Sequence, residues 1–168
     1  MGDSSTADMI GAIVNAGKTA WDIIKDGRAV STAQSAYCGA VPEKIPFTKL
    51  YGWKKKTGSW NVVYENLYGI DVIECELKYS FQYNGQCEAH PKSVFVTNFC
   101  VWAPKCDVAW GFTFDVNAST RGRPLNVGTK DKVIGAIPLL VRMSAGGANS
   151  KSQTMELTAR GDGKLLTK

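Results

Sequence analysis

Apolar and polar residues alternate without a break over residues 73–83. A period of two places successive side chains on opposite faces of an extended strand, so this pattern predicts an antiparallel strand with one buried and one solvated face. Asn84 and Gly85 follow directly, and these residue types tolerate the positive φ of a type I′ turn. The sequence therefore predicts a hairpin that returns through residues 93–102.

The same signals predict a mainly β fold for the rest of the chain beyond Pro42. The segment 107–116 alternates as cleanly as the first strand, with Val108, Trp110, Phe112, Phe114 and Val116 on one side. The strand that contains residues 73–83 is predicted to begin at Tyr68. Turn residues separate the remaining strands, which are predicted over residues 47–53, 59–64, 132–143 and 152–159. Because two such faces can bury each other and no βα alternation occurs, we expect an antiparallel β-sandwich.

An amphipathic α-helix is predicted ahead of the sandwich, over residues 8–26. Ser5 and Asp8 fit a capping box, and Gly27 fits a helix end. Apolar residues then recur at steps of three and four, which gives the helix an apolar face formed by Ile10, Ile13, Val14, Trp21 and Ile24. The predicted organisation is therefore a helix and connector over residues 1–41, followed by a β-sandwich domain over residues 42–168.

Composition and charge narrow the class of protein. A chain of 168 residues can bury one core, and no run approaches the roughly 18 apolar residues of a membrane-spanning helix. The net charge of +5 favours acidic partners such as membrane surfaces, but the basic residues are too thinly spread to predict a nucleic-acid partner. The polar, acidic start does not resemble a secretory signal, so we expect a cytoplasmic protein or one exported without a classical signal.

The five cysteines form no metal-binding spacing, and their odd number cannot be used up in internal disulfides. We expect them to be mostly reduced, with Cys75 acting as a small hydrophobic residue on the apolar face of its strand. A Cys100–Cys106 or a Cys87–Cys100 disulfide stays open.

No catalytic constellation is present in the sequence. The single histidine, His90, stands alone beside Pro91 in a loop, whereas acid–base catalysis needs several positioned groups. There is no nucleophile elbow, phosphate-binding glycine loop or zinc spacing. We therefore expect neither an enzyme nor a metal or cofactor site.

Aromatic and basic residues cluster around a hairpin turn predicted at Thr57-Gly58. Trp and Tyr favour the membrane interface, and lysines are attracted to lipid phosphates. On the membrane interpretation the cluster binds lipid; on the alternative one the rings belong to the core and the lysines keep a turn soluble. The candidate binding residues are Tyr51, Trp53, Lys54, Lys55, Lys56 and Trp60.

Two stretches carry a resemblance to a known family. The segment Trp110-Gly111-Phe112-Thr113-Phe114-Asp115-Val116-Asn117 is similar to a strand leading into a Phe-Asp-x-Asn turn, and residues 139–157, with Met143-Ser144-Ala145-Gly146, resemble a closing hairpin. Together with a basic chain of this size and an amphipathic N-terminal segment, they resemble the actinoporin-like cytolysins. That family's run of Tyr and Trp after the turn is replaced here by Ala118-Ser119-Thr120.

The resemblance implies a pore-forming toxin whose sandwich binds choline-headgroup lipid through clustered aromatic residues and whose N-terminal helix detaches to line a pore. It adds Phe114 and Asp115 to the candidate binding residues and makes the apolar face of the helix the lipid-facing row. The leading hypothesis is thus a non-enzymatic membrane-binding, pore-forming protein that oligomerises on a lipid surface. The alternative is a soluble lectin-like or self-assembling structural module that binds glycan or protein.

Overall fold

The computed structural model of the protein describes residues 11–14, 20–25, 28–31, 38–42, 45–121, 124–147 and 150–168. In these ranges the chain is mainly β and forms two sheets whose neighbouring strands pair antiparallel. One sheet has five strands, in the order β1 (Gly11–Val14), β4 (Cys38–Val41), β7 (Phe95–Val108), β6 (Asp71–Gly85) and β5 (Lys54–Glu65).

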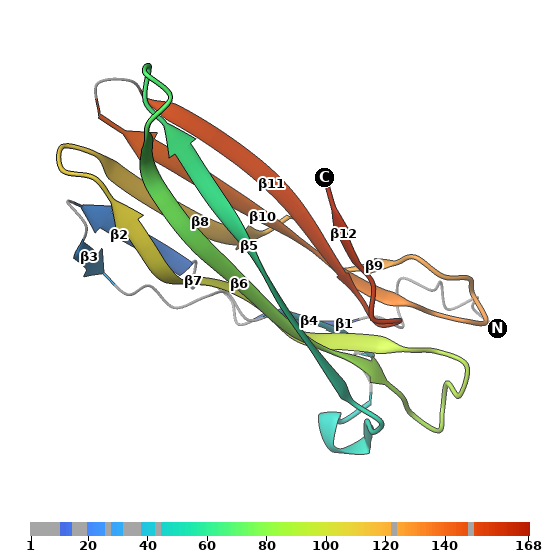
Figure 1. The fold of residues 1–168 in the computed structure, drawn as a ribbon. Helices are drawn as coiled ribbons and strands as arrows, with labels where there is room; N and C mark the ends of the chain where they lie inside the picture. Colours follow the sequence, from blue (N-terminus) through green and yellow to red (C-terminus); the bar gives the residue numbers. More distant parts are fainter. Residues whose placement is uncertain are drawn as a thin grey trace.

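The second sheet has seven strands. Its order is β12 (Leu165–Thr167), β11 (Lys151–Arg160), β10 (Gly135–Gly146), β8 (Thr113–Thr120), β2 (Ala20–Lys25) and β3 (Arg28–Ser31), with β9 (Leu125–Asn126) on β10. In Figure 1, β5 and β6 of the first sheet lie in front of β8, β10 and β11 of the second sheet. The mainly β, antiparallel, two-layered fold predicted from the sequence is confirmed.

The core lies between the two sheets, as the alternation in β6 predicts. Ile73, Leu77 and Phe81 on one face of β6 are buried, whereas Glu74 on the other face is exposed. They share one cluster with residues of the second sheet, among them Phe114, Leu139, Val141 and Leu157. Strands with one apolar face have thus buried these faces against each other, which is the main source of stability in such folds.

One predicted turn and one predicted strand are corrected by the structure. Asn84 has the expected positive φ of 62°, but β6 runs on through Gly85 and a longer connection leads to β7. The ring of Trp53 lies where a side chain at position 85 would stand, so glycine is needed there for space. Residues 47–49 form a short 3-10 helix, η2 (Phe47–Lys49), and the strand predicted over 47–53 is wrong.

The continuous strand predicted over 107–116 is also wrong. β7 ends at Val108 and β8 begins at Thr113. A turn separates them, with Gly111 at a φ of +83° that glycine adopts without strain. The apolar alternation simply continues through this turn, so periodicity alone did not reveal it.

The described parts of the N-terminal region are paired with the sandwich. Within the range predicted as a helix, the structure has two strands: β1 pairs with β4, and β2 pairs with β8 from Ala20↔Ala118 to Lys25↔Thr113. The remaining residues of that range, including Ile10, lie outside the described residues, and the helix and the boundary near residue 42 stay predictions. No helix in the described ranges has the length and apolar character needed to cross a bilayer.

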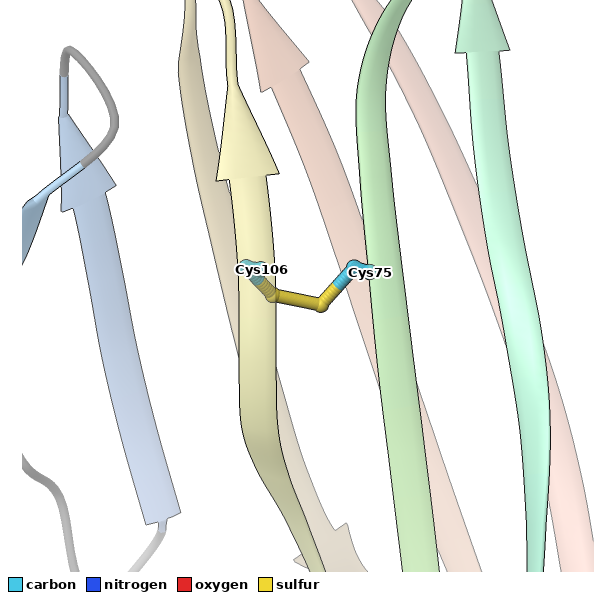
Figure 2. Close-up of a disulfide and its surroundings, with 2 residues drawn as sticks. All are labelled: Cys75 and Cys106. Carbon is cyan, nitrogen blue, oxygen red and sulfur yellow. A yellow bond between two sulfur atoms is a disulfide. The ribbon is translucent and has the colours of Figure 1, made fainter.

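A disulfide joins β6 to β7. Cys75 and Cys106 face each other directly in the register of the two strands, with their Cα atoms 4.1 Å apart (Figure 2). This pairing is neither of the two left open by the sequence, and it corrects the expectation that Cys75 is a reduced cysteine acting as a small hydrophobic residue. Cys75 does lie on the buried apolar face, and Cys87 is a buried free thiol.

Candidate functional site

The tip of the β5–β6 hairpin carries exposed apolar side chains on a well-ordered turn. The side-chain oxygen of Asn66 accepts hydrogen bonds from the N–H groups of Tyr68 (2.9 Å) and Ile70 (3.0 Å). The N–H of Asn66 donates to the carbonyl of Ile70 at 2.8 Å, and Gly69 takes a φ of +72°. These bonds hold Leu67, Tyr68 and Ile70 outward, with exposed fractions of 80%, 88% and 59%.

A second exposed ring comes from the turn between β7 and β8. The N–H of Ala109 donates to the carbonyl of Val72, at the base of the hairpin, at 2.8 Å, and the N–H of Phe112 donates to Ala109 at 3.1 Å. Trp110 at the tip of this turn is 88% exposed. The hydrogen bond to Val72 therefore ties the turn that carries Trp110 to the hairpin that carries the other exposed residues.

We name Leu67, Tyr68, Ile70 and Trp110 the apolar end. Among the residues whose side chains the structure describes, these four are the most exposed large hydrophobic ones. The hairpin tip and η2 lie at opposite ends of β5 (Figure 1). Soluble proteins seldom expose several large apolar side chains together, and such groups are typical of interaction surfaces.

Charges of both signs border the apolar end. Asp71 and Asp107 are exposed, and so are Glu65 and Lys151. Within the described residues, no group of His, Cys, Asp and Glu side chains is arranged to hold a metal ion. Three of these four groups are acidic, so the border of the apolar end is not a basic patch.

A pocket of about 200 Å³ lies beside the apolar end. Its lining combines the hairpin with the ends of the second sheet: Tyr64, Glu65, Asn66, Leu67, Tyr68, Val72, Ile73, Phe112, Ala145 and Lys151. The hydroxyl of Tyr64 is buried and has no hydrogen-bond partner in the part of the chain that the structure describes. Burial raises the pKa of this hydroxyl, so it remains protonated near neutral pH.

The aromatic-basic residues predicted from the sequence are spread over residues 51–60, from just before β5 to its middle. The turn predicted at Thr57-Gly58 is wrong, because both residues pair within the strand, with Ser80 and Tyr79. The ring of Tyr79 covers Gly58, which explains a glycine in mid-strand. Trp60 packs against that same ring at 6.0 Å between centroids and is half-buried.

The other members of the predicted cluster lie toward the opposite end of β5, near η2. Tyr51 is 50% exposed, and Trp53 stacks on Phe47 with ring centroids 5.6 Å apart. Lys54 and Lys55 are exposed. The ammonium of Lys56 instead donates to the carbonyl of Gly163 at 2.8 Å. The structure thus brings Tyr51, Trp53 and Lys54 near one another and separates them from Trp60.

The two candidates added by the family resemblance lie on β8, inside the second sheet. Phe114 is fully buried and contacts the ring of Tyr64 at 5.6 Å. Asp115 is half-buried between β10 and β2, opposite Ser144 and Ile23, and burial raises its pKa. Phe114 therefore stabilises the core in this structure.

The residues of the predicted helix face fall on two strands. Ile13 and Val14 belong to β1, and Trp21 and Ile24 belong to β2. Ile10 lies outside the described residues. β1 belongs to the five-stranded sheet and β2 to the seven-stranded one, so the described members of this row are divided between the two sheets.

The sequence contained a signal for the apolar end that periodicity obscured. Asn66 and Gly69 are turn residues between two strand patterns, which is typical of a hairpin tip. Starting the next strand at Tyr68 and running another across Trp110 assigned both rings to strands. The turn chemistry of Asn66, Gly69 and Gly111 was the better guide.

Comparison with known proteins gives no relative: no protein family, no curated protein and no solved structure matches this chain.

Proposed function

We propose that this protein is a non-enzymatic membrane-binding protein whose apolar end enters the interface of a lipid bilayer. The observation that carries the proposal is the exposure of Leu67, Tyr68, Ile70 and Trp110 on two turns joined by the Ala109–Val72 hydrogen bond. Their exposure places a large apolar area in water in the absence of a partner. A bilayer removes that area from water.

The types of side chain at the apolar end suit a membrane surface. Trp and Tyr have an apolar body and a hydrogen-bonding edge, so they reside where acyl chains meet headgroups. Leu67 and Ile70 have no polar group and can reach the acyl region. Complete burial of one such side chain is worth about 1.5–3 kcal/mol, so four together suffice for stable association.

Zwitterionic lipid is expected to be sufficient for binding. Asp71, Asp107 and Glu65 border the apolar end together with Lys151, so an anionic surface would repel this border more than it attracts it. The overall charge of +5 still favours approach to an anionic membrane over long distances. Added salt should therefore lower the rate of association with an anionic membrane more than it lowers the affinity of the bound protein.

The first test compares two tyrosines at opposite ends of β5. Tyr68→Ala removes a ring that is 88% exposed at the apolar end, and Tyr51→Ala removes one that is 50% exposed near η2. We expect Tyr68→Ala to lower the partition coefficient onto phosphatidylcholine vesicles about tenfold, and Tyr51→Ala to change it less than about twofold. Vesicle co-sedimentation measures both.

Trp110→Ala should act like Tyr68→Ala, since the two rings belong to one surface. A larger loss for Tyr51→Ala than for Tyr68→Ala would instead favour the aromatic-basic residues near the start of β5 as the lipid-binding site. Unchanged partition in both Tyr68→Ala and Trp110→Ala would rule out the apolar end as a membrane anchor.

The pore-forming step is part of the same proposal and concerns the N-terminal region. Insertion of residues 8–26 as an amphipathic helix would place Ile10, Ile13, Val14, Trp21 and Ile24 toward lipid. For that, β2 must leave β8 and give up the pairs from Ala20↔Ala118 to Lys25↔Thr113. A membrane that offers more apolar burial than the sheet does would favour this exchange.

Deleting residues 1–27 separates binding from lysis. We expect the shortened protein to bind vesicles with its apolar end but to release no trapped dye, because the inserting segment is gone. Dye release and co-sedimentation are measured on the same vesicles. Lysis that survives the deletion, or that the full chain never produces with any lipid, contradicts pore formation without touching membrane binding.

The alternative functions would use the same exposed rings differently. A glycan-binding module would stack sugar on Tyr68 or Trp110, and a self-assembling module would cover the apolar end with a second copy. Light scattering after size exclusion in plain buffer detects the second case as a stable closed oligomer. The membrane proposal expects a monomer that assembles only on lipid.

A further inference from the structure

The pocket beside the apolar end combines a hydrocarbon lining with an opening at the exposed turn. We propose that it binds the linear alkyl chain of an amphiphile, with about six to eight carbon atoms inside and the polar head group in water. Such a chain can belong to a membrane lipid or to an amphiphile dispersed in water. The inference therefore goes beyond membrane binding and does not depend on it.

The inner walls of the pocket are apolar and buried. Val72, Ile73 and Ala145 line it and are at most 9% exposed. The hydroxyl of Tyr64 is covered by the protein, so a molecule in the pocket meets the ring of Tyr64 but does not reach its hydroxyl. A polar atom among these side chains would lose its hydrogen bonds to water without replacement, so the interior favours plain hydrocarbon.

The volume of the pocket sets the length of chain that it can hold. An apolar cavity of about 150 Å³ accommodates benzene, which gives each carbon atom about 25 Å³. The pocket measures about 200 Å³, so it has room for at most about eight carbon atoms. A flexible chain fills space less completely than a rigid ring, which lowers the expected number to about six to eight.

The polar side chains of the lining suit a head group rather than the chain. Glu65 and Lys151 are exposed, so they lie where the pocket meets water. Because their charges are opposite, they favour a head group without net charge. The side-chain oxygen of Asn66 already accepts hydrogen bonds from the N–H groups of Tyr68 and Ile70, so it holds the turn rather than the ligand.

The apolar surface of the pocket continues into the apolar end. Leu67 and Tyr68 line the pocket and are 80% and 88% exposed, so they connect its interior with the hairpin tip. A chain that leaves the pocket can lie along these two side chains before its head group meets water. A compact apolar molecule would fill the interior and leave this surface exposed. The arrangement therefore favours a chain-bearing amphiphile.

Contacts within the protein hold the walls of the pocket in place. The ring of Phe112 packs so closely on Gly147 that a side-chain carbon there would lie 2.8 Å from it. The ring of Tyr64 is held against Phe114 with ring centroids 5.6 Å apart. A pocket with fixed walls stops gaining affinity once a chain is longer than the space inside. Chain length is therefore the property to test.

The test measures affinity along the linear primary alcohols butanol, hexanol, octanol and decanol. Each has one uncharged head group and dissolves as single molecules. NMR titration follows the backbone amides of Val72, Phe112 and Ala145 as each alcohol is added. We expect saturable binding that strengthens about fourfold for each added CH₂ group up to about six to eight carbon atoms, and less than about twofold for each one beyond.

The octanediol with a hydroxyl group at each end is the matched probe for octanol. Its second hydroxyl must either enter the apolar interior or make the chain fold back to the opening. We expect the protein to bind this diol at least about tenfold more weakly than octanol.

Ala145→Leu adds hydrocarbon to the wall and should shorten the limiting chain length by about three carbon atoms. Ala89→Leu is the matched control, because it makes the same change at an exposed residue between β6 and β7, outside the lining. This control should leave every affinity within about twofold. If Ala145→Leu does not fold, the alcohol series and the diol on the wild type decide.

The same two variants identify the source of the chain. If a lipid chain of the bilayer enters the pocket, Ala145→Leu lowers partition onto phosphatidylcholine vesicles at least about tenfold and Ala89→Leu does not. If only dispersed amphiphiles enter it, both variants partition like the wild type while Ala145→Leu keeps its shortened limit for alcohols. Either result supports an alkyl-chain site.

Three results overturn the inference. The first is the absence of saturable shifts at the lining amides with any alcohol. The second is an affinity that rises with chain length without levelling off, or that is equal for octanol and the diol, as expected for adsorption to a surface. The third is a shift of the same amides when the protein alone is diluted, because a second copy would then fill the pocket. None of them contradicts the membrane proposal, which Trp110→Ala tests through a ring outside the lining.

Discussion

Replacing Phe81 by alanine is expected to lower the free energy of unfolding by about 3–5 kcal/mol, the usual range for removing a buried ring. Phe81 is completely buried in the middle of β6. Its ring meets Phe99 edge-on at 5.7 Å, and Tyr83 and Tyr79 lie at 6.1 and 6.3 Å. Alanine would leave a cavity bordered by rings that cannot collapse into it. Denaturant unfolding followed by circular dichroism measures the loss.

Phe47→Ala is the matched control, because it makes the same chemical change at a ring that is 45% exposed. Phe47 contacts Trp53 in a stack at 5.6 Å, and such a pair is worth about 0.5–1.5 kcal/mol beyond the area that it buries. We expect a loss of about 1 kcal/mol there. Similar losses for the two variants would contradict the placement of the main core between the sheets.

The sequence predicted the layers of the fold because burial follows a period of two in its longest strands. In β6, Ile73, Leu77 and Phe81 are buried where alternation placed them. In β10, Leu139, Val141 and Met143 repeat the pattern. Each of these strands has one face in the core, so hydrophobic periodicity reports its orientation directly.

The turns and the apolar end were harder to predict. Their residues continue the apolar-polar alternation of the neighbouring strands, although they lie in turns. Trp110 and Phe112 keep the period of Val108 and Phe114, yet the first is exposed at a turn and the second lines a pocket. Gly58 resembles a turn residue but is in mid-strand because Tyr79 needs its space. Such contacts join residues distant in sequence, and periodicity carries no information about them.

The structure describes only part of the range predicted as a helix, so the helix itself stays a prediction. Over residues 20–25 the run Ala-Trp-Asp-Ile-Ile-Lys is short enough to fit both a helical and an extended pattern. The structure has this run as β2, paired with β8. The conformation of this run therefore depends on what it contacts: β8 favours the extended form. The proposed insertion as a helix requires a membrane that binds residues 20–25 more strongly than β8 does.

Removing the disulfide is expected to cost about 3–4 kcal/mol of unfolding free energy, from the loop entropy that a link between residues 31 positions apart takes from the unfolded chain. Cys75 and Cys106 face each other across β6 and β7, so the bond also fixes the register of these strands (Figure 2). Exchanging both residues for alanine avoids burying a hydroxyl where Cys75 is completely buried.

The wild type should lose a similar amount in reductant, while the double variant should be insensitive to it. Cys87→Ala is the control: it removes a buried free thiol, so we expect a loss of about 1 kcal/mol that is the same with and without reductant. Denaturant unfolding in both conditions measures all three proteins. If reductant left the wild type unchanged while the double variant was destabilised, the loss would come from the cavity, and the register of β6 on β7 would be held by pairing and packing alone.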